Sequence, residues 1–186
     1  MKNTILQLTN IVQRASLIEN RDEQISYIVD SICEAISVDV CSVYVLGQDN
    51  DMHLIASHGL LNNHKIKIPD LKGIVGEVVK TRHAVNIANA RSHPSYYHIE
   101  GIAEDRFSSF CGVPVVRYGS VIGVLTVQRI AAEKLSEESE AFVATLASQL
   151  SHLIQHRASV SENNANLRLK GIRGASGIGI GNVLLC

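Results

Sequence analysis

Hydrophobic residues recur every three or four positions over the first 36 residues. A polar segment, ENRDE at 19–23, separates two such stripes. This spacing places the apolar side chains on one face of a helix. The sequence therefore predicts two amphipathic helices, whose apolar positions are Ile5, Leu8, Val12 and Ala15 in the first and Ile25, Ile28, Val29, Ile32 and Ile36 in the second.

The pattern then changes to short runs rich in β-branched residues, which are typical of strands. Residues 38–46 and 52–57 are two such runs, and GQDND between them favours a hairpin turn. HKIKIP alternates basic residues and isoleucines, as an edge strand with one exposed face does. Three further strands are predicted at AVNIA (84–88), SSFCGVPVVR (108–117) and SVIGVLTVQR (120–129).

Helices and a loop complete the predicted order of elements. GIVGEVVKTRH (73–83) reads as a short helix, and residues 89–107 show no sustained period and predict a long loop. Residues 135–156 form a long amphipathic helix with Ser136 as its N-cap and an apolar face of Phe142, Leu146, Leu150 and Leu153. Together these elements predict an α+β fold, an antiparallel sheet with helices packed mainly on one side.

Composition narrows the classes of protein. A chain of 186 residues with 46% hydrophobic residues suits one globular domain with extensions. The net charge of −1 gives no reason to expect nucleic acid or an anionic membrane as a partner. Neither a signal peptide nor a membrane-spanning run is visible. The four cysteines lack C-x-x-C spacing, so we expect no zinc site, no disulfide framework and a cytoplasmic location.

The order of these motifs resembles a GAF domain over residues 1–157. The resemblance rests on CSVYVL, on GIVGEVV before AVNIANARSHPSY, and on FCGVPVVRYGSVIGVLTVQR. It implies a GAF-like (PAS-like) antiparallel sheet flanked by helices and a role as a small-molecule sensor.

The end of the chain resembles a second family. SENNANLRLK reads as part of a linker over 158–170, and GIRGASGIGIGNVLL (171–185) is similar to the first strand of phosphoenolpyruvate-utilising proteins of the enzyme I family. A GAF domain before that strand is the arrangement in nitrogen-type phosphoenolpyruvate–protein phosphotransferases. The resemblance implies that residues 171–186 are the truncated start of the N-terminal domain of a phosphoenolpyruvate-utilising enzyme, and that this fragment has no catalysis of its own. It also implies missing domains that use Mg²⁺ and phosphoenolpyruvate and transfer phosphate to a histidine phosphocarrier protein.

Other chemistries are weaker alternatives. The terminal glycines lack the Lys-Ser/Thr of a phosphate-binding loop. His152 and His156 lie one helical turn apart, but no third ligand accompanies them, and a helix edge explains them better. His93 and His98 could act as ligands or acid–base groups, although a loop that closes a pocket uses the same residues. The cysteines are expected to be buried core thiols.

The GAF resemblance implies a pocket between one sheet face and the short helix with its following loop. Polar groups set in an apolar wall suit a small-ligand site. The candidate ligand-binding residues are Ser42, Tyr44, Asn86, His93, Tyr96, Tyr97, Arg106, Phe107 and Cys111. The effector is expected to be an amino acid or a 2-oxo acid such as glutamine or 2-oxoglutarate, with Arg106 on its carboxylate and Asn86 on an amide.

Two functions remain open. The first is a regulatory sensor that controls autophosphorylation of the phosphotransferase. The second is a structural dimerisation module with a vestigial pocket. In either case we expect a homodimer through the terminal helices, because Ile11 and Ile18 widen the apolar stripe of the first helix and Ile154 widens that of the last.

Overall fold

The computed structural model describes residues 4–60, 66–98 and 106–154. Residues 1–154 form one compact unit, and the following description concerns that unit alone. The predicted linker at 158–170 and the glycine-rich segment at 171–186 lie outside the described residues.

A six-stranded antiparallel sheet forms the centre of the unit, in the order β3-β2-β1-β6-β5-β4. Its strands are β1 (Val40–Leu46), β2 (Met52–His58), β3 (Lys67–Ile68), β4 (Val85–Ile87), β5 (Ser109–Arg117) and β6 (Ser120–Arg129). The longest strands, β5 and β6, join through the tight turn at Tyr118 and Gly119, whose φ angles are +47° and +76°. The predicted α+β fold is confirmed, and the predicted edge strand is the short β3.

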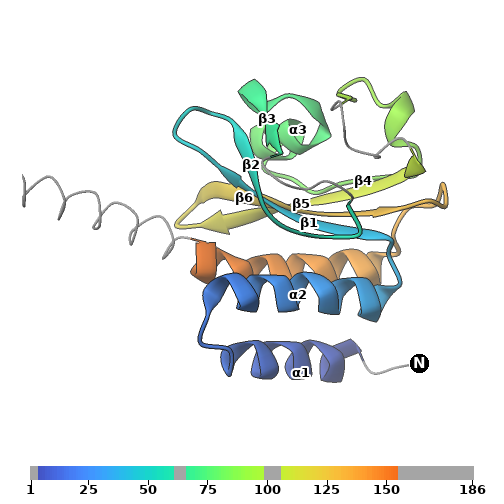
Figure 1. Cartoon of the computed structure of the whole chain (residues 1–186). Helices are drawn as coiled ribbons and strands as arrows, with labels where there is room; N and C mark the ends of the chain where they lie inside the picture. Colours follow the sequence, from blue (N-terminus) through green and yellow to red (C-terminus); the bar gives the residue numbers. More distant parts are fainter. Residues whose placement is uncertain (1–3, 61–65, 99–105, 155–186) are drawn as a thin grey trace, which may run out of the picture. The chain divides into compact units, whose positions relative to one another are not determined.

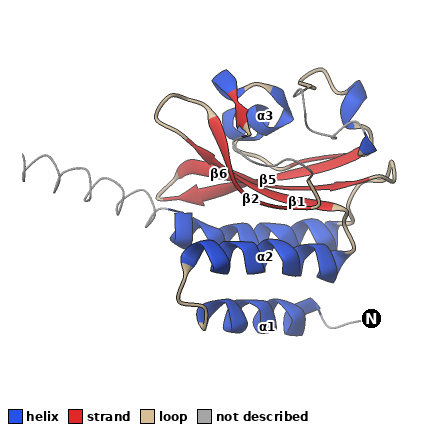
Figure 2. Cartoon of the chain, in the orientation of Figure 1, coloured by secondary structure: helices blue, strands red, loops and turns tan. Residues whose placement is uncertain are grey.

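Helices cover both faces of the sheet in separate layers (Figures 1 and 2). One face carries α2 (Arg21–Ile36) and the last helix (residues 137–154), and α1 (Thr4–Ser16) packs on α2 as an outer layer. The opposite face carries α3 (Gly73–Thr81), which follows the short 3-10 helix η1 (Pro69–Leu71). A second 3-10 helix, η2, covers Ala90–Ser92.

Alternation along the strands separates two hydrophobic cores. On β6, Leu125 and Val127 belong to the core beneath the helix layer, whereas Val124 belongs to the core beneath α3. Thr126 and Gln128 share the face of Val124, because side chains two residues apart point to the same side of a strand. The sheet is therefore a single layer that faces the helices on one side and the site described below on the other.

Local capping explains where two of the helices begin. The Asn20 Oδ1 atom accepts hydrogen bonds from the N–H groups of Asp22 and Glu23, at 2.9 and 3.2 Å. The Ser136 hydroxyl oxygen accepts from the N–H of Ser139 at 3.2 Å, as the sequence predicted for this helix. These bonds satisfy backbone donors that the first turn of a helix leaves unpaired.

Two isoleucines expected to face a second subunit are instead packed inside the unit. Ile11 and Ile154 are 7% and 4% exposed and belong to the core of the helix layer. The apolar residues that α1 leaves in solvent are Ile5 and Leu6, and Leu17 directly after it is exposed as well. The expectation that Ile11 and Ile154 form a subunit contact does not fit this packing.

An ion-pair network joins the β1–β2 turn to the segment that leads into α3. The Lys67 ammonium lies 3.0 Å from Asp49 Oδ2 and also contacts Asp51. The second carboxylate oxygen of Asp51 accepts the N–H of Asp70 in η1 at 2.8 Å. Hydrogen bonds from Lys67 are the main cause of the lowered pKa of both Asp49 and Asp51.

We expect the stability of the unit to fall in acid partly through this network. A carboxyl group whose pKa is lowered on folding stabilises the fold above its unfolded pKa of about 3.9, and the contribution is lost as the pH falls through the folded pKa. The variant Lys67→Met should therefore lose less stability than the parent between about pH 4 and pH 2, as measured by urea unfolding at each pH. The exposed Lys134→Met is the control, and equal acid slopes for parent and Lys67→Met would contradict the expectation.

Candidate ligand-binding site

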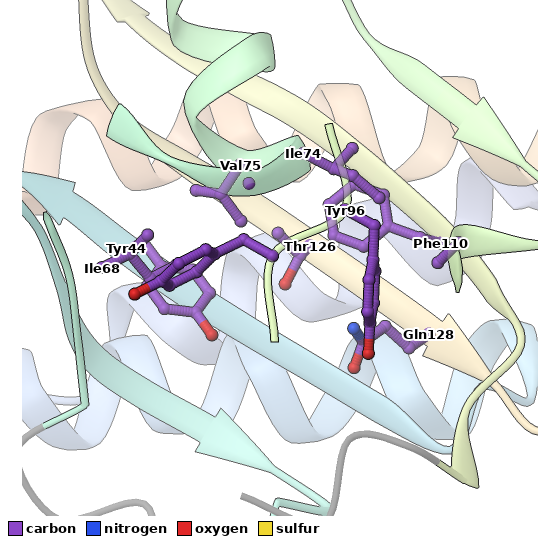
Figure 3. Close-up of a pocket in the computed structure, with 11 residues that line it drawn as sticks. Tyr44, Ile68, Ile74, Val75, Tyr96, Phe110, Thr126 and Gln128 are labelled. Carbon is purple, nitrogen blue, oxygen red and sulfur yellow. The ribbon is translucent and has the colours of Figure 1, made fainter. Parts of the chain in front are cut away.

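A cavity of about 50 Å³ lies between the sheet and α3 (Figure 3). Strands β1, β5 and β6 form its floor, the start of α3 its roof, and the turn after β4 its side. The described residues that line it are Tyr44, Ile68, Gly73, Ile74, Val75, Ala90, Tyr96, Tyr97, Phe110, Thr126 and Gln128. A water needs roughly 10–15 Å³ of such volume, so the cavity has room for a group of only a few atoms.

The register of three neighbouring strands builds the floor. Gln128 on β6 lies opposite Phe110 on β5, and Thr126 lies opposite Gly112. Side chains on one face of paired strands are direct neighbours, so the polar side chains of Thr126 and Gln128 lie beside the Phe110 ring. A Cβ atom at Gly112 would come within 2.8 Å of that ring, and its absence leaves space for the ring over the sheet.

Glycines allow the roof to approach closely. Gly73 begins α3 with a φ angle of +74°, a conformation that favours glycine. A Cβ atom there would lie 3.2 Å from the Cβ of Tyr97. Gly76, one turn later, is so close to the preceding segment that a Cβ atom would lie 1.7 Å from the carbonyl oxygen of Leu71. These contacts fix α3 against η1 and against the side of the pocket.

The side of the pocket is a hydrogen-bonded turn that we call the lid turn (residues 90–97). The Ala90 N–H donates to the carbonyl of Ser108 at 2.7 Å, which attaches the lid turn to the start of β5. The N–H of Tyr96 donates to the carbonyl of His93 at 2.9 Å. At the rim, the Lys72 ammonium lies 5.5 Å from the centre of the Tyr97 ring, within the range of a cation–π contact.

The described lining is apolar and aromatic with a few neutral polar groups. None of the described lining side chains is acidic, basic or a histidine. Its polar groups are the three tyrosine hydroxyls, the Thr126 hydroxyl and the Gln128 amide. Figure 3 shows the polar ends of Thr126 and Gln128 extending from β6 towards the space under α3. Such a pocket favours a ligand group that is neutral, at least partly apolar and able to form hydrogen bonds.

Three predicted residues, Tyr44, Tyr96 and Tyr97, line this pocket. Ser42 lies on the same sheet face, but its hydroxyl is 2.7 Å from that of Ser57 and does not line the cavity. Phe107 is buried in the core beneath α3. His93 belongs to the lid turn, where its Nδ1 accepts the N–H of Ser95 at 3.3 Å and lies 3.6 Å from Glu77 Oε2.

Two predicted residues point to the opposite face of the sheet. The Asn86 amide nitrogen donates to the carbonyl of Leu135 at 2.9 Å and to Glu140 Oε2 at 2.8 Å, and its oxygen accepts the N–H of Leu135 at 3.0 Å. Asn86 therefore attaches β4 to the start of the last helix. Cys111 is fully buried in the core of the helix layer, where burial raises its pKa to about 12. The expectation that both residues bind a ligand in this pocket does not fit this geometry.

Arg106 also lies away from the cavity lining. Its guanidinium donates to the carbonyl of Gly59 at 3.2 Å and stacks 4.7 Å from the centre of the Phe107 ring. The side chain thus connects the end of β2 to the segment before β5. A carboxylate in the pocket as described would not meet this arginine.

The sequence interpretation missed Thr126, Gln128 and Phe110. A signal for the first two was present, because they are polar residues at alternate positions in GVLTVQR, an otherwise apolar strand. Alternate positions share one face. Polar residues on a face of a central strand that is otherwise buried indicate a site.

Other chemistries find little support in the described part of the chain. Cys33, Cys41 and Cys111 are buried and form no disulfide. Over residues 4–60, 66–98 and 106–154, no three His, Cys, Asp or Glu side chains are grouped so that they could hold a metal ion. No helix within these ranges has the length and apolar character to cross a membrane.

The sheet carries helices on one face and a small, partly apolar pocket under α3 on the other, an arrangement that suits a domain that binds a small molecule. The chain belongs to the GAF domain family, whose sequence model matches residues 20–154. The resemblance found in the sequence is therefore confirmed.

Within the GAF family, the chain is similar to the GAF domains of phosphotransferases. The chain is 30% identical to the GAF domain of a phosphoenolpyruvate-protein phosphotransferase from Coxiella burnetii, with a TM-score of 0.79, and the match covers 86% of this chain and 97% of that one. It is 29% identical over 181 residues to the phosphoenolpyruvate-dependent phosphotransferase system protein of Escherichia coli K12, a match that covers 95% of this chain and 24% of that protein. The chain thus spans about a quarter of the length of this relative.

A second group of relatives shares a shorter segment. The chain is 36% identical over 96 residues to the Nif-specific regulatory protein of Azospirillum lipoferum, which covers 49% of this chain and 15% of that protein. Together with the phosphotransferase GAF domains, this similarity supports a regulatory sensor role.

Proposed function

We propose that this GAF domain binds a nitrogen metabolite in the pocket under α3 and thereby controls autophosphorylation of a phosphoenolpyruvate–protein phosphotransferase. Glutamine is the first candidate, and 2-oxoglutarate is its rival. The observation that carries the proposal is the pocket itself, in which Tyr44, Tyr96 and Phe110 surround the neutral polar groups of Thr126 and Gln128. The similarity of the chain to phosphotransferase GAF domains supports the proposal that the pocket has a regulatory role.

The strands of the pocket floor give a physical route to the rest of the protein. Leu125 and Val127 of β6 pack in the helix layer, and Thr126 between them lines the pocket. Arg117 at the end of β5 donates to the carbonyl of Ser151 in the last helix at 3.2 Å. A ligand controls another domain only if it binds two states with different affinity. We propose that those states differ in the position of the last helix on the sheet.

The remaining partners belong to the same proposal. In the full-length protein, Mg²⁺ and phosphoenolpyruvate serve the catalytic domains, and a histidine phosphocarrier protein receives the phosphate. A homodimer through the helix layer is also part of it, and the exposed Ile5, Leu6 and Leu17 are the apolar residues there that a second copy would cover.

The second candidate function is a dimerisation module whose pocket is filled by its own side chains. The small volume of the cavity, about 50 Å³, favours it, because a whole amino acid is larger than this space. For the sensor proposal, the same volume implies that the lid turn moves outward on binding, or that only part of the ligand enters.

Calorimetry with glutamine, 2-oxoglutarate, nucleotides and tetrapyrroles separates the two functions. We expect one metabolite to bind, and Tyr96→Ala to weaken it about 10-fold, because the variant removes one apolar wall of the pocket. Tyr118→Ala is the matched control, since Tyr118 is 84% exposed on the β5–β6 turn. Amide exchange in the lid turn should slow when ligand is added. A parent chain that binds no metabolite and sediments as a dimer would favour the dimerisation module.

A further inference from the structure

Gln128 is the amide among the polar residues that line the pocket. It lies on a central strand, partly buried, with its side chain lining the cavity. Within the described part of the chain, its amide makes no hydrogen bond to another protein group. A partly buried amide that has no protein partner gains most from a ligand that supplies one.

Thr126 provides a second polar group beside it. The two residues are two positions apart on β6, which corresponds to about 7 Å along the strand. Thr126 is 2% exposed, and its hydroxyl donates to the carbonyl of Ser42 at 3.4 Å, so the lone pairs of the hydroxyl oxygen are left to accept. The floor therefore offers the two N–H donors of the Gln128 amide and two acceptor oxygens, those of Gln128 and Thr126.

The rest of the lining selects against charge. With no ionic side chain among the described lining residues, a carboxylate placed in the cavity would lose its hydration without a counter-charge. A planar neutral group fits better, because Tyr44, Tyr96 and Phe110 supply apolar ring surfaces. The cavity volume of about 50 Å³ admits a group of a few heavy atoms.

We propose that Gln128 determines specificity by pairing with a neutral carboxamide of the ligand, which enters the cavity between the aromatic rings. The oxygen of the ligand carboxamide accepts a hydrogen bond from the Gln128 N–H. The NH₂ of the ligand carboxamide donates to the Gln128 oxygen and to the Thr126 hydroxyl oxygen. The charged part of the ligand stays at the rim, on the side of Tyr97 and Lys72. This inference rests on the proposed sensor function and deepens it, because it favours glutamine over glutamate and 2-oxoglutarate.

The test uses calorimetry on the 186-residue chain with four probes: glutamine, glutamate, 2-oxoglutarate and 2-aminopentanoate, which lacks the amide. In the parent we expect glutamine to bind at least 10-fold more tightly than the other three. Gln128→Leu should weaken glutamine by about 10-fold for each hydrogen bond that is lost, and change 2-aminopentanoate less than 2-fold. Gln128→Glu, of nearly the same size, should also weaken glutamine, because it cannot donate.

Controls separate the possible failures. Gln13→Leu on the exposed side of α1 should change nothing, and thermal unfolding of each variant shows that it is folded. A parent that binds 2-oxoglutarate or glutamate as tightly as glutamine, or a folded Gln128→Leu that retains its glutamine affinity, would overturn the inference and leave the sensor role standing. A parent that binds none of the metabolites would overturn both.

Discussion

Replacing Phe142 by alanine is expected to lower the free energy of unfolding by about 3–5 kcal/mol. Phe142 is 1% exposed and lies in the core that joins the last helix to α2 and to the sheet. Removing its ring loses the transfer free energy of the buried atoms and leaves a cavity that the surrounding structure fills only in part. Because a domain of this size is stable by about 5–15 kcal/mol, the change is a large part of the total.

Urea unfolding followed by circular dichroism measures this change as a shift of the midpoint with an unchanged slope. Ile130→Ala is the control, since Ile130 is 56% exposed, and it should stay within about 0.5 kcal/mol of the parent. A Phe142→Ala variant as stable as Ile130→Ala would show that the last helix contributes little to the core.

Replacing Gly76 by alanine is expected to lower the free energy of unfolding by about 2–3 kcal/mol, although alanine is the better helix former. The new methyl group would lie 1.7 Å from the Leu71 carbonyl oxygen, so α3 must move away from η1. Ile74 and Val75 on the same helix line the pocket, and ligand binding should therefore weaken together with stability.

Gly119→Ala is the matched control for Gly76→Ala. Gly119 has a φ angle of +76° and no neighbouring atom within 4 Å of a Cβ. Its replacement should cost only the strain of the left-handed conformation, about 1–2 kcal/mol, and leave ligand affinity unchanged. Equal affinity for the ligand in the parent and in a folded Gly76→Ala would show that the position of α3 does not control the pocket.

The fold was predictable because its signals are repeated over many residues. Several positions in each element indicate the same type of secondary structure, as in the strands of residues 108–129 and in the helical stripe of Phe142, Leu146 and Leu150. The order of these elements along the chain is then compatible with only a few sheet topologies. The resemblance to the family agreed with this pattern.

The site was predicted only in part, because a short strand does not reveal which way its residues face. β4 has three residues, and nothing in the sequence AVNIA showed that Val85 and Ile87, rather than Asn86, face α3. The longer β1 gave Tyr44 the correct face. Arg106 was assigned to a carboxylate from its charge alone, whereas the carbonyl of Gly59, 47 residues earlier, is its hydrogen-bond partner.

The last helix is attached to the sheet near both of its ends, so it follows a movement of the sheet as one rigid body. Asn86 holds its beginning through Leu135 and Glu140, and Arg117 holds its other end through Ser151. A helix over residues 137–154 is about 27 Å long. A rotation of this helix by about 5° would displace one end relative to the other by about 2 Å, comparable to the helix shifts that switch subunit interfaces. In the proposed sensor function, a small rotation at the pocket would therefore reach the end of the helix as a larger displacement, without unfolding any element.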